Sequence, residues 1–339
     1  MKIPKSSKAV VLPAYNKNLL RAIISLKIED VELPKLCADE LLIKVLASPC
    51  NPSDIAFLQG SYNVVKDLPA IPGFEATGEV IDAGENAKLM IGNRVSCFSQ
   101  DEKIGCWSEF MISKVQNCIV LKDGLDIFQA ATISINPLTA FGMFEMAMQN
   151  SSKTILLNAA GGQVAEFIRA FAKKNAVEVI NIFRKKNTFQ NIEPTENQIN
   201  LYSDEENFEE NLRLACDGKS NITAFDAVGG FSTGLIFNNL PPKSSIIVYG
   251  GLSNEVIGGI DVLDMIFRKK QIIGFNLNDY IEKLKTDGNF KIVVDKIQDM
   301  IINGEISTKI NETFLLKDII PGIRAYIKNM SAGKVIFKM

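Results

Sequence analysis

Small residues near the middle of the chain mark the first candidate site. The stretch LLNAAGGQVAEF runs from Leu156 to Phe167 and overlaps the apolar run TILLN (154–158). Small side chains let backbone N–H groups approach a pyrophosphate, and the N-terminus of a helix favours negative charge, so this turn is typical of a dinucleotide site. Gln163 and Ala165 depart from the usual glycine pattern, and a tight turn without a ligand is the alternative interpretation.

A basic turn follows the next expected strand, VEVINIF (177–183), and consists of Arg184, Lys185 and Lys186. A guanidinium at this place can bind a 2′-phosphate through two hydrogen bonds, whereas a carboxylate would repel it. The sequence therefore predicts NADPH as the cofactor, with a solvated basic turn as the alternative. The predicted cofactor-binding residues are Asn158, Ala160, Gly161, Gly162, Gln163, Val164, Arg184, Lys185, Tyr202, Val228, Tyr249 and Gly250.

The elements that must position these residues follow two patterns. About the first 120 residues read as short strands bounded by turn residues, which predicts a small, mostly antiparallel β domain. After a helix at 135–148, strands alternate with helices, which predicts right-handed crossovers and a doubly wound parallel sheet. The tail from about residue 278 is expected to complete the first domain. The expected strands lie at 39–48, 76–84, 93–99, 106–113, 117–122, 154–158, 177–183, 199–203, 224–230, 245–251 and 271–277.

The composition excludes several classes of function. The 339 residues carry a net charge of −2 without a basic stripe, which argues against a nucleic-acid partner. No stretch approaches the about 20 apolar residues of a membrane helix, and the N-terminal segment lacks a signal-peptide pattern, so we expect a cytoplasmic protein without a membrane partner. The chain has no histidine, which rules out a histidine triad and argues strongly against catalytic zinc, and its six cysteines are expected to be reduced.

Four motifs occur in a recognisable order: IPGFEATGEVIDAG (71–84), IGNRVSCFS (91–99), GCWSEF (105–110) and NPLTAF (136–141). In this order the chain resembles the medium-chain dehydrogenase/reductase superfamily over nearly its whole length. The resemblance implies an α/β protein with two domains. A GroES-like catalytic domain would comprise 1–122 and 277–339, and a Rossmann cofactor-binding domain would comprise 123–276.

The zinc ligands of that superfamily are replaced in this sequence. Asn51 stands where the zinc members have a cysteine, and Phe74 stands where they have a histidine. Only a short segment joins Cys97 to Cys106, where those members carry a four-cysteine lobe. The chain therefore looks like a member of the zinc-free branch, and we predict no metal.

Within that branch, NPSDIAFLQGSY (51–62) resembles the 2-enoyl thioester reductases. The catalytic-acid candidate of that family maps onto Tyr62, and an amphipathic side chain on a turn is the alternative. Asn51 and Thr139 are the other predicted catalytic residues. Asn51 could instead cap the turn before Pro52, and Thr139 could serve helix packing.

An activated alkene can be reduced without a Lewis acid when the protein positions the partners and supplies a donor to the developing enolate oxygen. We therefore predict an NADPH-dependent reductase of the C=C bond of an α,β-unsaturated carbonyl, with 2-enoyl thioesters as one candidate substrate class. A quinone or 2-alkenal reductase is one alternative, and a non-catalytic nucleotide-binding or redox-sensing protein is another. The expected partner is a small enoyl- or quinone-type substrate, and QIIGFNL (271–277) could pair with a second copy in a homodimer.

Overall fold

The computed structural model describes residues 3–100, 105–185 and 197–339. The chain forms two compact units, one from Met1–Pro137 with Ile292–Met339 and one from Leu138–Lys291. Both boundaries lie later in the chain than those of the predicted domains. The Thr132 hydroxyl bonds to Thr308 at 2.8 Å within the first unit, which extends that unit past residue 122.

The first unit is built on a β-sheet with the strand order β14-β15-β3-β4-β5-β7, and β6 pairs with β3. Its neighbouring strands are antiparallel, except that β14 runs parallel to β15. The antiparallel strands β1 and β2 form a separate pair. The strands are β1 (Ser6–Val11), β2 (Lys27–Glu32), β3 (Glu40–Pro49), β4 (Glu75–Ala83), β5 (Arg94–Phe98), β6 (Phe110–Lys114), β7 (Cys118–Val120), β14 (Ile310–Leu315) and β15 (Lys334–Lys338).

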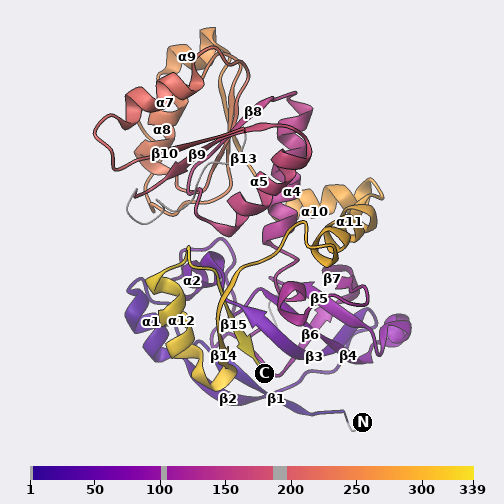
Figure 1. Ribbon diagram of the computed structural model, residues 1–339. Helices are drawn as coiled ribbons and strands as arrows, with labels where there is room; N and C mark the ends of the chain where they lie inside the picture. The colour runs from indigo at the N-terminus through magenta and orange to yellow at the C-terminus, as the bar shows by residue number, and fades with distance from the viewer. Residues whose placement is uncertain (1–2, 101–104, 186–196) are drawn as a thin grey trace. The chain divides into compact units, whose positions relative to one another are not determined.

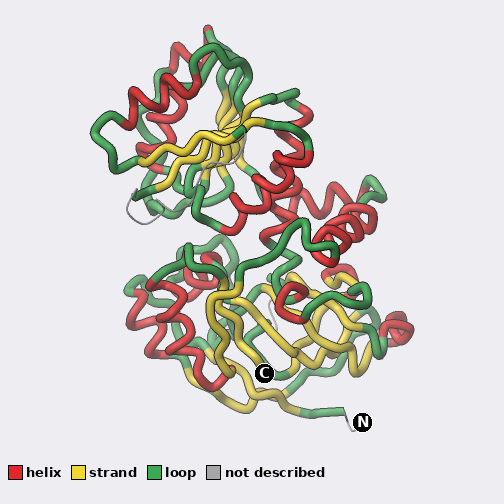
Figure 2. The backbone as a smooth tube through the Cα atoms, in the orientation of Figure 1, coloured by secondary structure: helices red, strands yellow, loops and turns green. Residues whose placement is uncertain are grey.

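Short helices cover this sheet and close its core (Figure 2). Trp107 is fully buried, its ring lies 5.4 Å from that of Phe337, and its Nε1 donates to the Pro49 carbonyl at 3.2 Å. Trp107 is thus a packing residue. The helices are α1 (Leu19–Ser25), α2 (Pro52–Leu58), α3 (Ile127–Ala130), α11 (Phe290–Ile302) and α12 (Ile319–Lys328), with 3₁₀ turns η1 (Glu85–Met90), η2 (Val115–Asn117) and η3 (Leu316–Asp318).

The second unit is a doubly wound parallel sheet with the order β10-β9-β8-β11-β12-β13, as the alternating pattern predicts. Side chains of α7 and α8 pack on one face of this sheet, and α4 and α5 lie on the other (Figure 1). Its elements are α4 (Asn136–Gln149), β8 (Thr154–Leu157), α5 (Gln163–Lys174), β9 (Glu178–Phe183), β10 (Gln198–Tyr202), α7 (Phe208–Cys216), β11 (Thr223–Asp226), α8 (Gly230–Asn239), β12 (Ser245–Val248), α9 (Val262–Phe267), β13 (Gln271–Gly274) and α10 (Leu277–Thr286).

Most predicted elements are present, and the differences have local causes. The strand expected at 271–277 ends at Gly274, because the Asn276 side chain accepts the Asn278 N–H and starts α10. The strands β1 and β2 and the helix α9 are additional to the prediction. Within the described ranges, none of the helices is long and apolar enough to cross a bilayer.

Candidate active site

The turn between β8 and α5 is the candidate phosphate-binding site of the second unit. It runs from Asn158 to Gly162, and α5 begins at Gln163. Amide groups in the first turn of a helix have no carbonyl partner within that helix, and they carry partial positive charge. Gln163 and Val164 lie in this first turn, so their backbone N–H groups suit phosphate oxygens.

The small residues of this turn act in different ways. Ala159 adopts a φ of 48°, and its carbonyl accepts the Gly162 N–H at 2.8 Å. A Cβ on Gly162 would lie only 3.2 Å from that carbonyl oxygen. Ala160 is buried and its N–H donates to the Ile182 carbonyl at 3.1 Å, so Ala160 anchors the turn to β9. Gly161 is half-buried and adds no side chain to the loop. The loop therefore fits the close approach of a pyrophosphate.

Asn158 and Asp226 join the two strands at which the sheet order reverses, β8 and β11. Asn158 Nδ2 donates to the Asp226 carboxylate, and its Oδ1 accepts the Ala227 N–H at 2.8 Å. Asp226 also accepts the Thr233 hydroxyl and the Val228 N–H, the latter at 2.8 Å. In open parallel sheets, ligands bind outside the carboxyl ends of the strands at such a reversal. Asn158 is thus placed to shape the predicted crevice.

The basic residues after β9 lie at the same edge of the sheet, because β9 is parallel to β8. Arg184 and Lys185 are exposed, and the Arg184 carbonyl accepts the Ser203 hydroxyl at 3.2 Å. Tyr202 ends β10 and stacks on Phe183, with ring centroids 5.8 Å apart. An exposed guanidinium beside a phosphate turn fits the 2′-phosphate of NADPH. Lys186 lies outside the described residues.

The ends of β11 and β12 carry the remaining predicted cofactor residues. Val228 and Tyr249 are half-buried, and the Tyr249 N–H donates to the Asp226 carbonyl at 2.9 Å. Burial raises the pKa of Tyr249, and the charge of Asp226 adds to this effect. A Cβ on Gly250 would lie 2.9 Å from the Ala227 carbonyl oxygen, so glycine is required by the backbone itself. The structure thus gathers the predicted cofactor residues at the carboxyl edge of one sheet.

Tyr62 lies on the loop after α2 in the first unit and is half-buried. Its ring lies 5.4 Å from that of Phe74, and Gln100 Nε2 donates to its Oη at 3.1 Å. This bond engages the phenol oxygen as an acceptor and does not use the phenol hydrogen. Burial raises the pKa of Tyr62, and Asp54 adds to this effect, so the phenol is a neutral donor at pH 7. Contact of Tyr62 with a substrate stays a prediction.

Asn51 belongs to a buried polar cluster of Asn51, Asp54, Glu75 and Lys334, which we call the Asn51 cluster. Asn51 Nδ2 donates to Glu75 Oε2 at 3.2 Å, and Asn51 Oδ1 accepts from Lys334 Nζ. Asp54 accepts the backbone N–H groups of Asn51 at 2.8 Å and Phe74 at 3.1 Å. The cluster therefore fixes the start of α2 and the residue on which the Tyr62 ring packs.

Burial dominates the protonation of this cluster. It raises the pKa of Asp54 to about 7 against the opposing effect of backbone hydrogen bonds and of Lys334. It also raises the pKa of Glu75 to about 7, and Lys334 and Asn51 oppose that shift. Burial lowers the pKa of Lys334, while Glu75 and Asp54 oppose the change. Burial therefore favours the protonated form of both carboxyl groups in this cluster.

Two residues of the first unit were not singled out from the sequence. Gln100 carries no sequence signal, and Lys334, the first residue of β15, carries none either, because a lysine at a strand end is usually exposed. Glu75 accepts the Ile135 N–H at 2.9 Å and thus orients backbone, as its strand position favours. Thr139 lies buried in α4, and its catalytic role stays a prediction.

Phe74 packs between two aromatic rings at the position where the resemblance implies a replaced zinc ligand. Its centroid lies 5.3 Å from that of Phe57 and 5.4 Å from that of Tyr62. Among the described residues, no three His, Cys, Asp or Glu side chains come together as a group that could hold a metal. That the protein binds no zinc stays a prediction, which elemental analysis can test.

Comparison with known proteins agrees with this architecture. The family model of the alcohol dehydrogenase GroES-like domain matches residues 37–123. A solved structure assigned as an NADPH:quinone reductase from Mesorhizobium loti has a TM-score of 0.90 and 27% identity over 100% of both chains. These matches support the resemblance of the chain to the medium-chain dehydrogenase/reductase superfamily.

Curated relatives are more specific in name. The mitochondrial enoyl-[acyl-carrier-protein] reductase of Bos taurus is 26% identical over 323 residues, which cover 92% of this chain and 84% of that protein. The one of Caenorhabditis elegans is 28% identical over 303 residues, which cover 86% of each. The 2-enoyl thioester reductase heterodimer of Candida tropicalis has a TM-score of 0.78 at 23% identity, covering 98% of this chain and 100% of that one, and shows the shared fold.

Proposed function

We propose that this chain is an NADPH-dependent reductase of the C=C bond of α,β-unsaturated carbonyl compounds, with 2-enoyl thioesters as the substrate class. The observation that carries the proposal is Tyr62, a neutral, half-buried phenol whose oxygen accepts from Gln100. It lies in the segment that resembles the 2-enoyl thioester reductases. The enoyl reductases among the relatives support the same substrate class.

The residues of the second unit fit the cofactor. The first turn of α5 would hold the pyrophosphate, and Arg184 with Lys185 would hold the 2′-phosphate. Gly162 and Gly250 let neighbouring backbone segments approach each other closely at the carboxyl edge of this sheet. NADPH, when bound, supplies the hydride that the alkene accepts.

The first unit supplies the protic part of the reaction. The Tyr62 O–H donates to the carbonyl oxygen on which negative charge develops, or delivers a proton to the α-carbon. Gln100 orients the phenol oxygen, and the Asn51 cluster holds Phe74 behind the phenol ring. Thr139 is proposed to assist substrate or nicotinamide binding, whereas both amide atoms of Asn51 are engaged by Glu75 and Lys334, so Asn51 acts through the cluster.

Replacement of the phenol by a phenyl ring tests the mechanism. Tyr62→Phe should slow NADPH oxidation with crotonyl-CoA by about 10²- to 10⁴-fold, the usual range for general acid catalysis. NADPH affinity should stay unchanged, because the phosphate contacts are elsewhere. Tyr15→Phe is the matched control, since it removes a hydroxyl that bonds to the Lys66 backbone at 2.8 and 3.0 Å. Near-normal turnover in Tyr62→Phe would remove Tyr62 from the reaction.

A second candidate function is the reduction of quinones or 2-alkenals, which the match to the Mesorhizobium loti structure supports. Quinone reduction needs no proton on carbon, so Tyr62→Phe should affect it less than enoyl reduction. Turnover of 1,2-naphthoquinone without turnover of crotonyl-CoA would favour this alternative. NADPH binding without turnover of either compound would favour the nucleotide-binding or redox-sensing role.

We further propose a homodimer formed through β13. This strand ends the sheet order and pairs with β12 among the described strands. The helix α9, which precedes it, exposes apolar side chains, with Ile266 at 64% and Phe267 at 76% exposure. A second copy can extend the sheet across β13 and cover these side chains.

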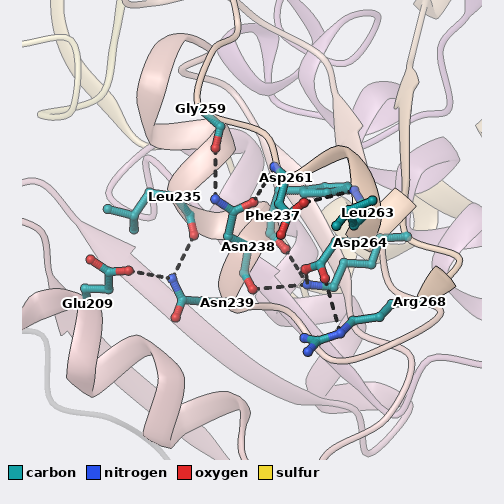
Figure 3. A network of polar contacts seen from close by, with 11 residues as sticks. Glu209, Leu235, Phe237, Asn238, Asn239, Gly259, Asp261, Leu263, Asp264 and Arg268 are labelled. Carbon is teal, nitrogen blue, oxygen red and sulfur yellow. Dashed lines mark hydrogen bonds and ion pairs between the residues drawn. The ribbon is translucent and has the colours of Figure 1, made fainter. Parts of the chain in front are cut away.

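A network of polar contacts joins α9 to the end of α8 and to the loop between them (Figure 3). The Asn238 amide donates to the Gly259 carbonyl at 2.8 Å and accepts the Asp261 N–H at 3.0 Å. Asp264 pairs with Arg268 at 3.2 Å and with the buried Lys270 at 2.5 Å. The apolar face is therefore presented by a fixed helix.

A charge introduced on the exposed apolar face of α9 tests the proposed dimer. Phe267→Asp should convert a sedimenting dimer into a monomer, whereas Leu89→Asp, at a 98% exposed position of the first unit, should not. A wild-type monomer at micromolar concentration would contradict the proposal.

The relatives are named as mitochondrial proteins, and the cytoplasmic location of this chain stays a prediction.

A further inference from the structure

Two thiols of the first unit face each other across neighbouring strands. Cys97 lies on β5 and Cys118 on β7, and the two residues are direct partners in this antiparallel pair. Their Sγ atoms are 3.3 Å apart and form a hydrogen bond. Directly opposed residues have Cα atoms about 4.5 or 5.5 Å apart, and both values lie within the range that a disulfide spans.

The two thiols differ in access. Cys97 is buried, whereas Cys118 is partly exposed on β7, the last strand in the sheet order. A hydrogen bond from Cys97 and one from Ser113 lower the pKa of Cys118, which favours its thiolate. A thiolate within reach of solvent is the form that oxidants attack.

From this arrangement we propose that Cys97 and Cys118 form a reversible intrachain disulfide when the protein meets a peroxide. The Cys118 thiolate sulfur attacks a peroxide oxygen, so an S–O bond forms, the O–O bond breaks, and the departing hydroxide takes a proton to become water. The Cys97 sulfur then attacks the Cys118 sulfur. The S–S bond forms, the S–O bond breaks, and the Cys97 proton leaves with the hydroxide as a second water. The two thiols are oxidised by two electrons, and one hydrogen peroxide is reduced to two waters.

The cysteine pair also lies close in sequence to Gln100, a residue that the proposed function uses. Cys97 is three positions before Gln100, whose amide donates to Tyr62 Oη at 3.1 Å. The chemistry of the thiols does not depend on the reductase activity, so it can be tested on the protein without substrate.

Peptide mapping of the peroxide-treated wild-type chain is the direct test. After alkylation of the remaining thiols, one cross-linked peptide should join Cys97 to Cys118, and dithiothreitol should restore both thiols. Cys97→Ser should leave a sulfenic acid on Cys118 that dimedone traps. Cys37→Ser and Cys216→Ser, which change an exposed and a buried thiol elsewhere, should retain the full yield of the cross-link.

Three outcomes would overturn the proposal. In the first, both thiols stay reduced at peroxide concentrations that oxidise the exposed Cys37. In the second, the disulfide joins either cysteine to Cys106, the buried thiol of the same core. In the third, dimedone labels Cys118 in the wild-type chain without a cross-link. Because the mapping uses the wild-type protein, none of these outcomes depends on a variant that folds.

Discussion

The buried carboxyl of Glu75 makes the stability of the first unit depend on pH. Its pKa is raised from 4.5 to about 7 in the folded chain, so the folded state binds this proton more tightly than the unfolded state. The resulting stabilisation is fully present below pH 4.5 and is lost as the pH rises through about 7. Glu75→Gln keeps an amide of similar shape in the Asn51 cluster and removes this titration.

The magnitude follows from the two pKa values. Where the folded state alone holds the proton, each pH unit lowers the free energy of unfolding by about 1.4 kcal/mol. Between pH 5 and pH 7 the Glu75 carboxyl therefore removes about 2 kcal/mol from the wild-type chain. Asp54, with a pKa of about 7, adds a similar slope that the wild type and the variant share.

Urea unfolding followed by tryptophan fluorescence measures this difference, because the single tryptophan, Trp107, is buried in the core of the first unit. Glu75→Gln should gain about 2 kcal/mol relative to the wild type between pH 5 and pH 7. Glu79→Gln, on an exposed position of the same strand, should follow the wild type. Parallel profiles of the wild type and Glu75→Gln would refute the burial argument.

Four other predictions concern the cofactor, the core and the metal. Arg184→Ala should raise the Kd of NADPH by about 10- to 150-fold and leave that of NADH unchanged, because it removes a hydrogen bond to a charged group worth about 1.5–3 kcal/mol. A fluorescence titration measures both Kd values, and Lys153→Ala, at an exposed position, is the control. Equal weakening of NADPH and NADH binding would contradict this prediction. Lys334→Met should lower the free energy of unfolding by about 3–5 kcal/mol, because it leaves buried carboxyl groups without a compensating charge. Lys338→Met, at an exposed position of the same strand, should change it far less in the same urea assay. Similar losses in the two variants would refute the role of the Lys334 charge. Gly250→Ala should destabilise the second unit by about 1–3 kcal/mol in thermal unfolding, whereas a Cβ on Gly251 meets nothing within 4 Å and should be tolerated. Elemental analysis should find no stoichiometric zinc, and a chelator should not reduce activity; one zinc per chain would contradict the assignment of Asn51 and Phe74 as replaced ligands.

The parallel sheet could be predicted because its signals are local. TILLN is an apolar run and VEVINIF is rich in β-branched residues, and the helix between them carries Phe167, Ile168 and Phe171 at helical spacing. A short apolar segment of this kind, followed by a helix, is most readily explained as a buried strand. The small residues of the phosphate turn and the basic residues after β9 also follow from strand ends that meet at one edge.

The rest depended on contacts between distant segments. The contact of Lys334 with Asn51 joins residues that are 283 positions apart, and no periodicity reports it. The strands β1 and β2 are separated by α1, so they lack the tight turn that marks a hairpin in a sequence. The helix α9 is short and exposes its apolar side chains, which removes the amphipathic pattern.

The split of the first unit constrains the order in which the chain folds. Its sheet places β15, which follows the second unit in the chain, between β14 and β3, and Lys334 of this strand donates to the Asn51 side chain just before α2. During synthesis the second unit, which is continuous, is complete before β15 emerges, whereas the segment of β3 from Ala47 to Pro49 has to wait for its partner strand. An open edge in a nascent chain is a site for pairing with other chains. Pairing of β15 with β3 closes this edge, and the same strand brings the charge of Lys334 to the Asn51 cluster.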